Sequence, residues 1–231
     1  MRYTVLACDY DGTLAHEGHV SEETVQALKD VRQSGRKLVL VTGRILDDVI
    51  DVFPAIGLFD RVVAENGALL YRPVTHGERL LADGPPKQFL AELMRRVPPP
   101  VSVGRVIVAT RIPHEVEAVE LIKELGLELQ IIFNKGAVMI LPSAVNKATG
   151  LNAALQELGV SPHSTVGVGD AENDHAFLSQ CGYSVAVANA LKALKEETDW
   201  VTSKANGEGT VELIRYLIAT DLELLRDRLK T

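Results

Sequence analysis

The stretch that decides the fold is residues 4–14, Thr-Val-Leu-Ala-Cys-Asp-Tyr-Asp-Gly-Thr-Leu, a mostly apolar run that meets two acids and a glycine. Its first five residues, Thr4–Cys8, are nearly continuously apolar, which is typical of a strand buried on both faces of a parallel sheet. Two later runs, Leu38–Val41 and Thr165–Val168, share this character. The sequence therefore predicts three buried parallel strands.

Amphipathic helices are predicted after these strands. The segment Ser21–Ser34 carries apolar residues at helical spacing, with Ser21 placed as an N-cap and Gly35 just past the end. Similar spacing occurs in residues 151–158 and in Thr210–Leu229. Strands that alternate with helices indicate a doubly wound, Rossmann-like α/β core, whose parallel sheet is covered on both faces.

The middle of the chain has a different pattern. Consecutive prolines at the end of residues 82–86 break regular structure. Asn134-Lys135-Gly136 is typical of a hairpin turn. We expect residues 83–142 to form a small inserted α+β cap domain, and residues 1–82 and 143–231 to form the core. The segments expected in the insert are Lys87–Val97, Val106–Ala109, His114–Leu125, Leu129–Phe133 and Val138–Leu141.

Composition excludes several classes of function. Lys and Arg number 24 against 31 Asp and Glu, a net charge of −7, so bulk attraction to nucleic acid or to an anionic membrane is not expected. Two cysteines in apolar stretches predict reduced thiols rather than a disulfide scaffold. No targeting or membrane-spanning segment is visible, so we expect a cytoplasmic monomer or homodimer whose partner is a small molecule.

Polar groups follow each predicted strand, and ligands of open parallel sheets bind at that edge. Asp9 and Asp11 follow the first strand, Thr42-Gly43 follows the second, and Gly169-Asp170 follows the third. Crowded carboxylates repel one another unless a cation lies between them, and oxygen ligands suit Mg²⁺. Lys147 comes after Asn146, a good N-cap, so it lies in the first turn of a helix, where backbone N–H groups favour an anion.

This set of groups suits phosphoryl transfer. An aspartate can attack phosphorus and form an aspartyl-phosphate. A second acid can protonate the leaving oxygen and later deprotonate water. Thr42 and Lys147 can hold the phosphoryl oxygens while charge spreads over them, and a metal ion offsets the charge of both carboxylate and phosphate.

Four motifs in the same order resemble those of the haloacid dehalogenase-like superfamily. They are Asp9-Tyr10-Asp11-Gly12-Thr13-Leu14, Val41-Thr42-Gly43-Arg44, Lys147, and Gly169-Asp170-Ala171-Glu172-Asn173-Asp174. The insert between the second and third motifs, together with Glu65-Asn66-Gly67-Ala68, resembles the Cof-type branch with its α/β cap. Two details qualify the likeness: the superfamily's dehalogenases lack the second aspartate, which this chain has, and Ala148 stands where the branch often has glycine.

The resemblance implies Asp9 as nucleophile and Asp11 as general acid and base. It implies that Mg²⁺ is held by the Asp9 side chain, the Asp11 carbonyl and Asp170. The candidate phosphate ligands are Thr42, Gly43, Lys147 and Asn173; the candidate metal ligands are Asp9, Asp11, Asp170 and Asp174; Arg44 and Asn66 are candidate substrate contacts. Asp174 either ligates the metal directly or supports its ligands.

The expected function is a Mg²⁺-dependent phosphatase acting on a small phosphorylated metabolite, such as a sugar phosphate or a short acid like phosphoglycolate. A phosphosugar mutase uses the same first motif but returns the phosphoryl group to sugar. A signalling receiver domain also gathers acids, a threonine and a lysine on a parallel sheet, but it is about half this length and has no cap. A catalytically silent metabolite-binding protein is disfavoured by Asp11.

Overall fold

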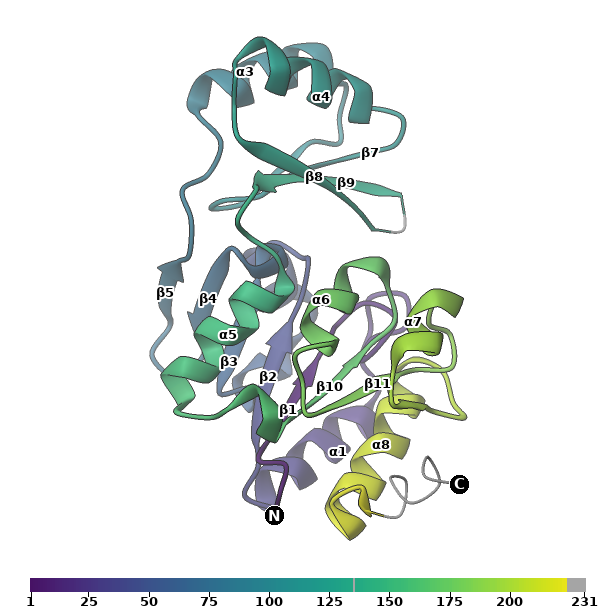
Figure 1. Cartoon of the computed structure of the whole chain (residues 1–231). Helices are drawn as coiled ribbons and strands as arrows, with labels where there is room; N and C mark the ends of the chain where they lie inside the picture. The colour runs from purple at the N-terminus through teal and green to yellow at the C-terminus, as the bar shows by residue number, and fades with distance from the viewer. Residues whose placement is uncertain (135, 224–231) are drawn as a thin grey trace.

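The computed structural model describes residues 1–134 and 136–223, arranged around two separate sheets (Figure 1). The larger sheet has eight strands in the order β12-β11-β10-β1-β2-β3-β4-β5. Pairing is parallel from β12 to β3, and the fully buried β1 lies between β10 and β2. The strands are β1 Val5–Cys8, β2 Lys37–Val41, β3 Arg61–Ala64, β4 Leu69–Arg72, β5 Gly77–Leu80, β10 Thr165–Gly169, β11 Tyr183–Ala186 and β12 Trp200–Val201.

One edge of this sheet differs from the all-parallel expectation, because β4 and β5 pair antiparallel to their neighbours. The chain reverses from β3 into β4 through the short 3₁₀ helix Glu65–Gly67 (η2), in which Glu65 and Asn66 have φ of 53° and 54°. Such left-handed backbone is uncommon outside glycine, and it permits a tight reversal without a crossover helix. The edge hairpin is therefore a local feature added to a doubly wound core.

Helices cover the core sheet as the apolar spacing predicts. The helix α1 begins after Ser21, whose hydroxyl accepts a hydrogen bond from the Thr24 amide. The helix α5 has a buried face that packs on β2, β3 and β4, while α6 packs on β10 and β11. The core helices are α1 Glu22–Gln33, α2 Leu46–Val52, α5 Lys147–Leu158, α6 His175–Leu178, α7 Lys192–Glu197 and α8 Asn206–Thr220.

The last helix differs from the predicted range Thr210–Leu229. It begins earlier and ends at Thr220, because Asp221 adopts a left-handed conformation. The Asp221 carboxylate accepts hydrogen bonds from the Arg2 amide and from the Arg36 guanidinium, which ties it to the start of the chain. Residues 224–229 of that prediction lie outside the described part of the chain. No helix of the described ranges is both long enough and apolar enough to cross a membrane.

The insert forms a four-stranded antiparallel sheet, β6-β7-β9-β8, that faces the core and carries two helices on its far side (Figure 1). Its helices bury Phe89, Leu93 and Leu121 in a small core of their own. This arrangement confirms the α+β cap expected from the sequence; the exact boundaries at 83 and 142 stay a prediction. The elements are α3 Lys87–Arg96, β6 Ser102–Val103, β7 Val108–Arg111, α4 Glu115–Glu124, β8 Leu129–Asn134 and β9 Ala137–Pro142.

Strand β7 begins later than the expected Val106, because a buried carboxylate from the core binds the backbone before it. Glu65, fully buried, accepts hydrogen bonds from the backbone N–H groups of Arg105 (2.9 Å), Val106 (2.7 Å) and Ile107 (3.0 Å). These amides are therefore satisfied by a side chain instead of a strand partner. The hairpin expected at Asn134-Lys135-Gly136 agrees with the pairing of Asn134 with Ala137, although residue 135 lies outside the described ranges.

The chain returns from the insert to the core beside Gly67. This residue has φ of +105°, and a Cβ placed on it would overlap the carbonyl oxygen of Asn146. Gly150, one turn into α5, has room for no side chain either, because its Cβ would lie 2.6 Å from the Gly67 Cα. The start of α5 is thus packed directly against the backbone of η2.

Candidate active site

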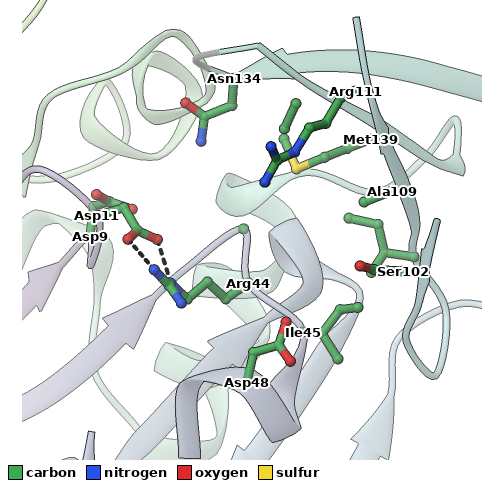
Figure 2. A pocket seen from close by; sticks show the side chains of 13 residues that line it. Asp9, Asp11, Arg44, Ile45, Asp48, Ser102, Ala109, Arg111, Asn134 and Met139 are labelled. Carbon is green, nitrogen blue, oxygen red and sulfur yellow. Dashed lines mark hydrogen bonds and ion pairs between the residues drawn. The ribbon is translucent and has the colours of Figure 1, made fainter. Parts of the chain in front are cut away.

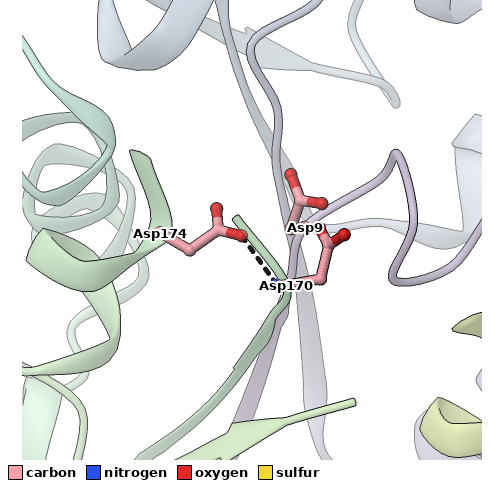
Figure 3. Close-up of side chains that lie close together, drawn as sticks. All are labelled: Asp9, Asp170 and Asp174. Atoms are coloured by element: carbon pink, nitrogen blue, oxygen red, sulfur yellow. Dashed lines mark hydrogen bonds between the residues drawn. The ribbon is translucent and has the colours of Figure 1, made fainter. Parts of the chain in front are cut away.

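The polar groups that follow the parallel strands meet at one edge of the core sheet, as the sequence predicts. Asp9 follows β1, Thr42 follows β2 and Asp170 follows β10, and all three are buried. Carboxylate oxygens of Asp9, Asp170 and Asp174 lie within 4.8 Å of one another (Figure 3). Since these strands are direct neighbours, the topology alone brings the acids together.

Lys147 lies among these acids in the first turn of α5. Its side chain is 1% exposed, and its ammonium donates to Asp9 Oδ1 at 2.5 Å and to Asp174 Oδ1 at 2.6 Å. The helix start is fixed by Asn146, whose side chain accepts hydrogen bonds from the amides of Ala148 and Thr149. The first turn is therefore rigidly placed, and it aims the lysine at the nucleophile expected from the sequence.

Asp174 has both carboxylate oxygens engaged. Oδ1 accepts from Lys147, and Oδ2 accepts from the backbone amides of Asp170 and Ala171, both at 2.9 Å. The Asp170 carboxylate accepts hydrogen bonds from the Thr13 hydroxyl at 3.3 Å and from the Asn189 side-chain amide at 3.4 Å. Asp174 thus holds the loop after β10 and the lysine at the same time.

Electrostatics in this cluster are unbalanced, since three buried carboxylates surround one buried ammonium. Burial first, and then the charge of Asp174, raises the pKa of Asp9 to about 7, although Lys147 opposes the change. Burial lowers the pKa of Lys147, but the charges of Asp174 and Asp9 outweigh it and hold that pKa above its usual range. The lysine stays protonated, and a further cation would favour the ionised form of Asp9.

Asp11 lies on the loop after β1, with a side chain 35% exposed. Arg44 binds it through two parallel hydrogen bonds, Nε to Oδ2 at 2.7 Å and Nη2 to Oδ1 at 2.6 Å (Figure 2). The same guanidinium lies over the Tyr10 ring, 5.2 Å from its centroid. Hydrogen bonding to Asp11 raises the pKa of Arg44, despite partial burial. The residue predicted as a substrate contact therefore contacts the second acid.

The loop after β2 meets Asn66 and the loop after β10. The Thr42 carbonyl accepts from the Asn66 amide at 3.0 Å, and the Asn66 Oδ1 accepts from the Asn173 side chain at 2.9 Å. Among described residues, the buried Asn66 Nδ2 and Asn173 Oδ1 have no hydrogen-bond partner. Gly43 lines the adjoining pocket, where a Cβ would lie 3.4 Å from Met139 Sδ. The structure thus brings Thr42, Asn66 and Asn173 together, and it places Gly43 in the wall of the pocket that Asp9 also lines.

A pocket of about 440 Å³ opens above Asp9 and Asp11, between the core and the sheet of the insert (Figure 2). Sequence reasoning identified only its floor. Its walls are Ile45, Asp48, Ser102, Ile107, Ala109, Arg111, Asn134, Ala137 and Met139. A signal for part of this set exists in the sequence: Ala109 and Arg111 are two residues apart, as are Ala137 and Met139, so each pair shares one strand face.

Comparison with known proteins agrees with this geometry. The family model of haloacid dehalogenase-like hydrolases matches residues 6–98 and 105–214. A protein named phosphoglycolate phosphatase from Methanothermobacter thermautotrophicus is 30% identical over 219 residues, covering 91% of this chain and 96% of its own. Another of that name, from Archaeoglobus fulgidus, is 30% identical over 221 residues, covering 92% and 96%.

Solved structures share the fold. A haloacid dehalogenase-like hydrolase from Bacteroides thetaiotaomicron superposes with a TM-score of 0.80 at 18% identity, covering 93% of this chain and 99% of its own. A protein from Thermoplasma acidophilum gives a TM-score of 0.79 at 18% identity, covering 93% and 97%. The motif order, the site geometry and the family match agree, and the chain belongs to the haloacid dehalogenase-like hydrolases.

Proposed function

We propose that this protein is a Mg²⁺-dependent phosphatase that hydrolyses a small phosphate monoester through an aspartyl-phosphate on Asp9. The observation that carries the proposal is the contact of Asp9 with the buried Lys147, beside Asp170 and at the floor of a pocket. The relatives named phosphoglycolate phosphatase support the same reaction class.

The residues present fit a hard divalent cation. Three buried carboxylates against one lysine leave an excess of negative charge that oxygen-ligated Mg²⁺ offsets. We assign Asp9, Asp170 and the backbone carbonyl of Asp11 as ligands. Asp174 serves as the support for Lys147 and for the loop after β10, because its oxygens are already engaged. When bound, the ion would neutralise charge on the phosphoryl oxygens and on the attacking carboxylate.

Asp9 attacks the phosphorus atom, and the bond between phosphorus and the ester oxygen breaks. Lys147 stays protonated beside the attacking carboxylate and stabilises the charge that spreads over the phosphoryl oxygens. Further polar contacts to the phosphoryl group come from the Thr42 hydroxyl, the Gly43 backbone and the side chains of Asn66 and Asn173. The unpartnered Asn66 Nδ2 is a donor that a phosphoryl oxygen would satisfy.

Asp11 gives its proton to the leaving oxygen, then takes one from the water that hydrolyses the aspartyl-phosphate, which releases inorganic phosphate and restores Asp9. Both oxygens of Asp11 are bound by Arg44 in this structure. The arginine must therefore release one oxygen, which takes up a proton, before Asp11 can act as the acid. The proton that Asp11 then takes from the hydrolytic water restores this protonated form for the next turnover. The cap sheet above the pocket excludes bulk water from the aspartyl-phosphate.

The test is phosphate release from an aryl phosphate by the wild type and by Asp9→Asn, with and without Mg²⁺. We expect the variant to lose activity and the wild type to lose it in EDTA and to recover on adding Mg²⁺. Asp11→Asn should slow turnover by about 10²–10⁴-fold, the usual value of acid–base help. Full activity of Asp9→Asn would end the proposal, and release that requires a sugar bisphosphate would favour a phosphosugar mutase.

A further inference from the structure

The roof of the pocket carries an arginine whose charge has no counterpart. Arg111 lies at the end of β7, and its guanidinium points down toward Asp9 and Asp11 (Figure 2). Among the described residues, no carboxylate forms an ion pair with it. Three other arginines of the cap are paired: Arg95 binds Glu92, Arg96 binds Glu124, and Arg105 binds Asp47 and Glu78.

The charged residues that line the pocket lie at two ends: those of the core at its floor, and Arg111 at its roof. Arg44, the second arginine of the lining, is held by Asp11 and has Asp48 nearby. Among the lining residues that the structure describes, Arg111 is thus the cation left to a ligand, at the opposite end from the site where the phosphoryl group reacts. A leaving group that carries a negative charge would meet it, whereas a neutral leaving group would leave it unused.

Next to Arg111, the cap offers one more polar group and otherwise an apolar wall. The Asn134 side chain lines the same space, and its amide nitrogen, a hydrogen-bond donor, points down into it (Figure 2). Ala109 and Met139 form the wall between the two ends. A volume of about 440 Å³ lies at the small end of the range for ligand pockets, so the acid must be short.

The strand that carries Arg111 is fixed to the core just before it begins. The buried Glu65 carboxylate binds the amides of residues 105–107, and Asn66 of the same turn contacts the Thr42 loop. The start of the strand that carries the arginine is therefore held at a set height above the phosphoryl site through a continuous chain of contacts. A fixed height selects for the distance between the two anionic groups of a ligand.

We infer that Arg111, assisted by Asn134, binds the carboxylate of the leaving group, so that the substrates are short phosphorylated carboxylic acids rather than neutral sugar phosphates. This inference rests on the proposed phosphatase function and names its substrate class. The contact lies away from the reacting phosphorus and is made equally before and during the reaction. Its loss should therefore raise KM more than it lowers kcat.

The experiment compares 2-phosphoglycolate with 2-hydroxyethyl phosphate, in which a neutral hydroxymethyl group replaces the carboxylate, and with 4-nitrophenyl phosphate. The variant Arg111→Met removes the charge from an exposed side chain and keeps its length. We expect kcat/KM for 2-phosphoglycolate to fall about 10- to 100-fold, as for other hydrogen bonds to charged groups. For the two esters without a carboxylate, kcat/KM should change less than about two-fold, so that the preference for 2-phosphoglycolate disappears.

Arg95→Met is the matched control, because Arg95 lies on α3, is 69% exposed and pairs only with Glu92 among described residues. It should leave all three rates unchanged. If Arg111→Met lowers all rates alike, or if the wild type does not prefer the acid, Arg111 has no part in recognising the leaving group and the phosphatase proposal stands. If the wild type releases phosphate from none of the three esters, both proposals fall together.

Discussion

Removal of the Asp9 charge should stabilise the metal-free protein at alkaline pH. The perturbation is Asp9→Asn, which keeps the shape of the side chain and removes one charge from a cluster of three buried carboxylates. Burial and the Asp174 charge raise the pKa of Asp9 from 3.8 to about 7 in the folded protein. The folded state thus holds its proton more tightly than the unfolded chain, so the wild type loses stability as pH rises from about 4 to about 7, and the loss is complete above pH 7.

The magnitude follows from the same values. A rise in pKa from 3.8 to about 7 corresponds to about 4 kcal/mol, because each tenfold change in proton binding is about 1.4 kcal/mol. The substitution to asparagine recovers only part of this free energy. The amide is still a buried polar group, and its contact with Lys147 is weaker than the ionic contact that it replaces. We expect a gain of about 1–3 kcal/mol above pH 8, or roughly 2–12 °C in Tm, and almost none near pH 4.

The assay is thermal unfolding in EDTA between pH 4 and 9, followed by circular dichroism. Asp83→Asn is the control, because Asp83 is exposed in the segment before the cap, and its Tm difference should not vary with pH. Added Mg²⁺ should raise the Tm of the wild type and shrink its gap to Asp9→Asn. A variant less stable than the wild type at pH 8 in EDTA would refute the reasoning that the cluster is strained by excess negative charge.

Two further predictions concern contacts that fix the core and the cap. Burial raises the pKa of Glu157, but hydrogen bonds from Arg72, Arg61 and Arg79 outweigh it and bring the pKa to about 2. The stabilisation that ionised Glu157 provides is present above pH 4.5 and fades as pH falls toward 2. Glu157→Gln should therefore lower the free energy of unfolding in urea by about 1–3 kcal/mol at pH 7 and by less at pH 3. An equal loss at both pH values would contradict this. Glu65→Gln should speed amide hydrogen exchange at residues 105–107 by about tenfold or more, measured by mass spectrometry, and unchanged exchange would refute the anchoring role of Glu65.

The sequence identified the parts of the fold that local pattern determines. Continuous apolar runs predicted β1, β2 and β10 to within one residue, and the caps at Ser21 and Asn146 predicted the starts of α1 and α5. The antiparallel edge β4–β5 was missed, because it depends on left-handed backbone at Glu65 and Asn66 that apolar spacing does not reveal. The start of β7 was misplaced because a buried side chain far along the chain takes its amides.

The candidate site divides in the same way. Acids that follow parallel strands converge where those strands are neighbours, so the meeting of Asp9 and Asp170 was expected on that condition, which the strand order meets. The sequence placed Lys147 in the first turn of a helix, and the structure shows its contact with Asp9. The contact of Arg44 with Asp11 depends on how two loops approach each other, and the sequence does not contain that distance. In the sequence Arg111 is one of several cap cations, and only the orientation of the small sheet shows that it lines the pocket.

The close packing of Gly67 against the Asn146 carbonyl has a consequence for how such a chain can diversify. The polypeptide re-enters the core at this contact, and Lys147 follows at the very next position, so the lysine takes its place from the core alone. The inserted domain before this contact can therefore be lengthened, shortened or exchanged while Lys147 keeps its position beside Asp9. The core residues that would carry the reaction and the inserted residues that would select the leaving group are therefore separate along the chain. Substitutions in the insert can change the leaving group while the core site stays the same.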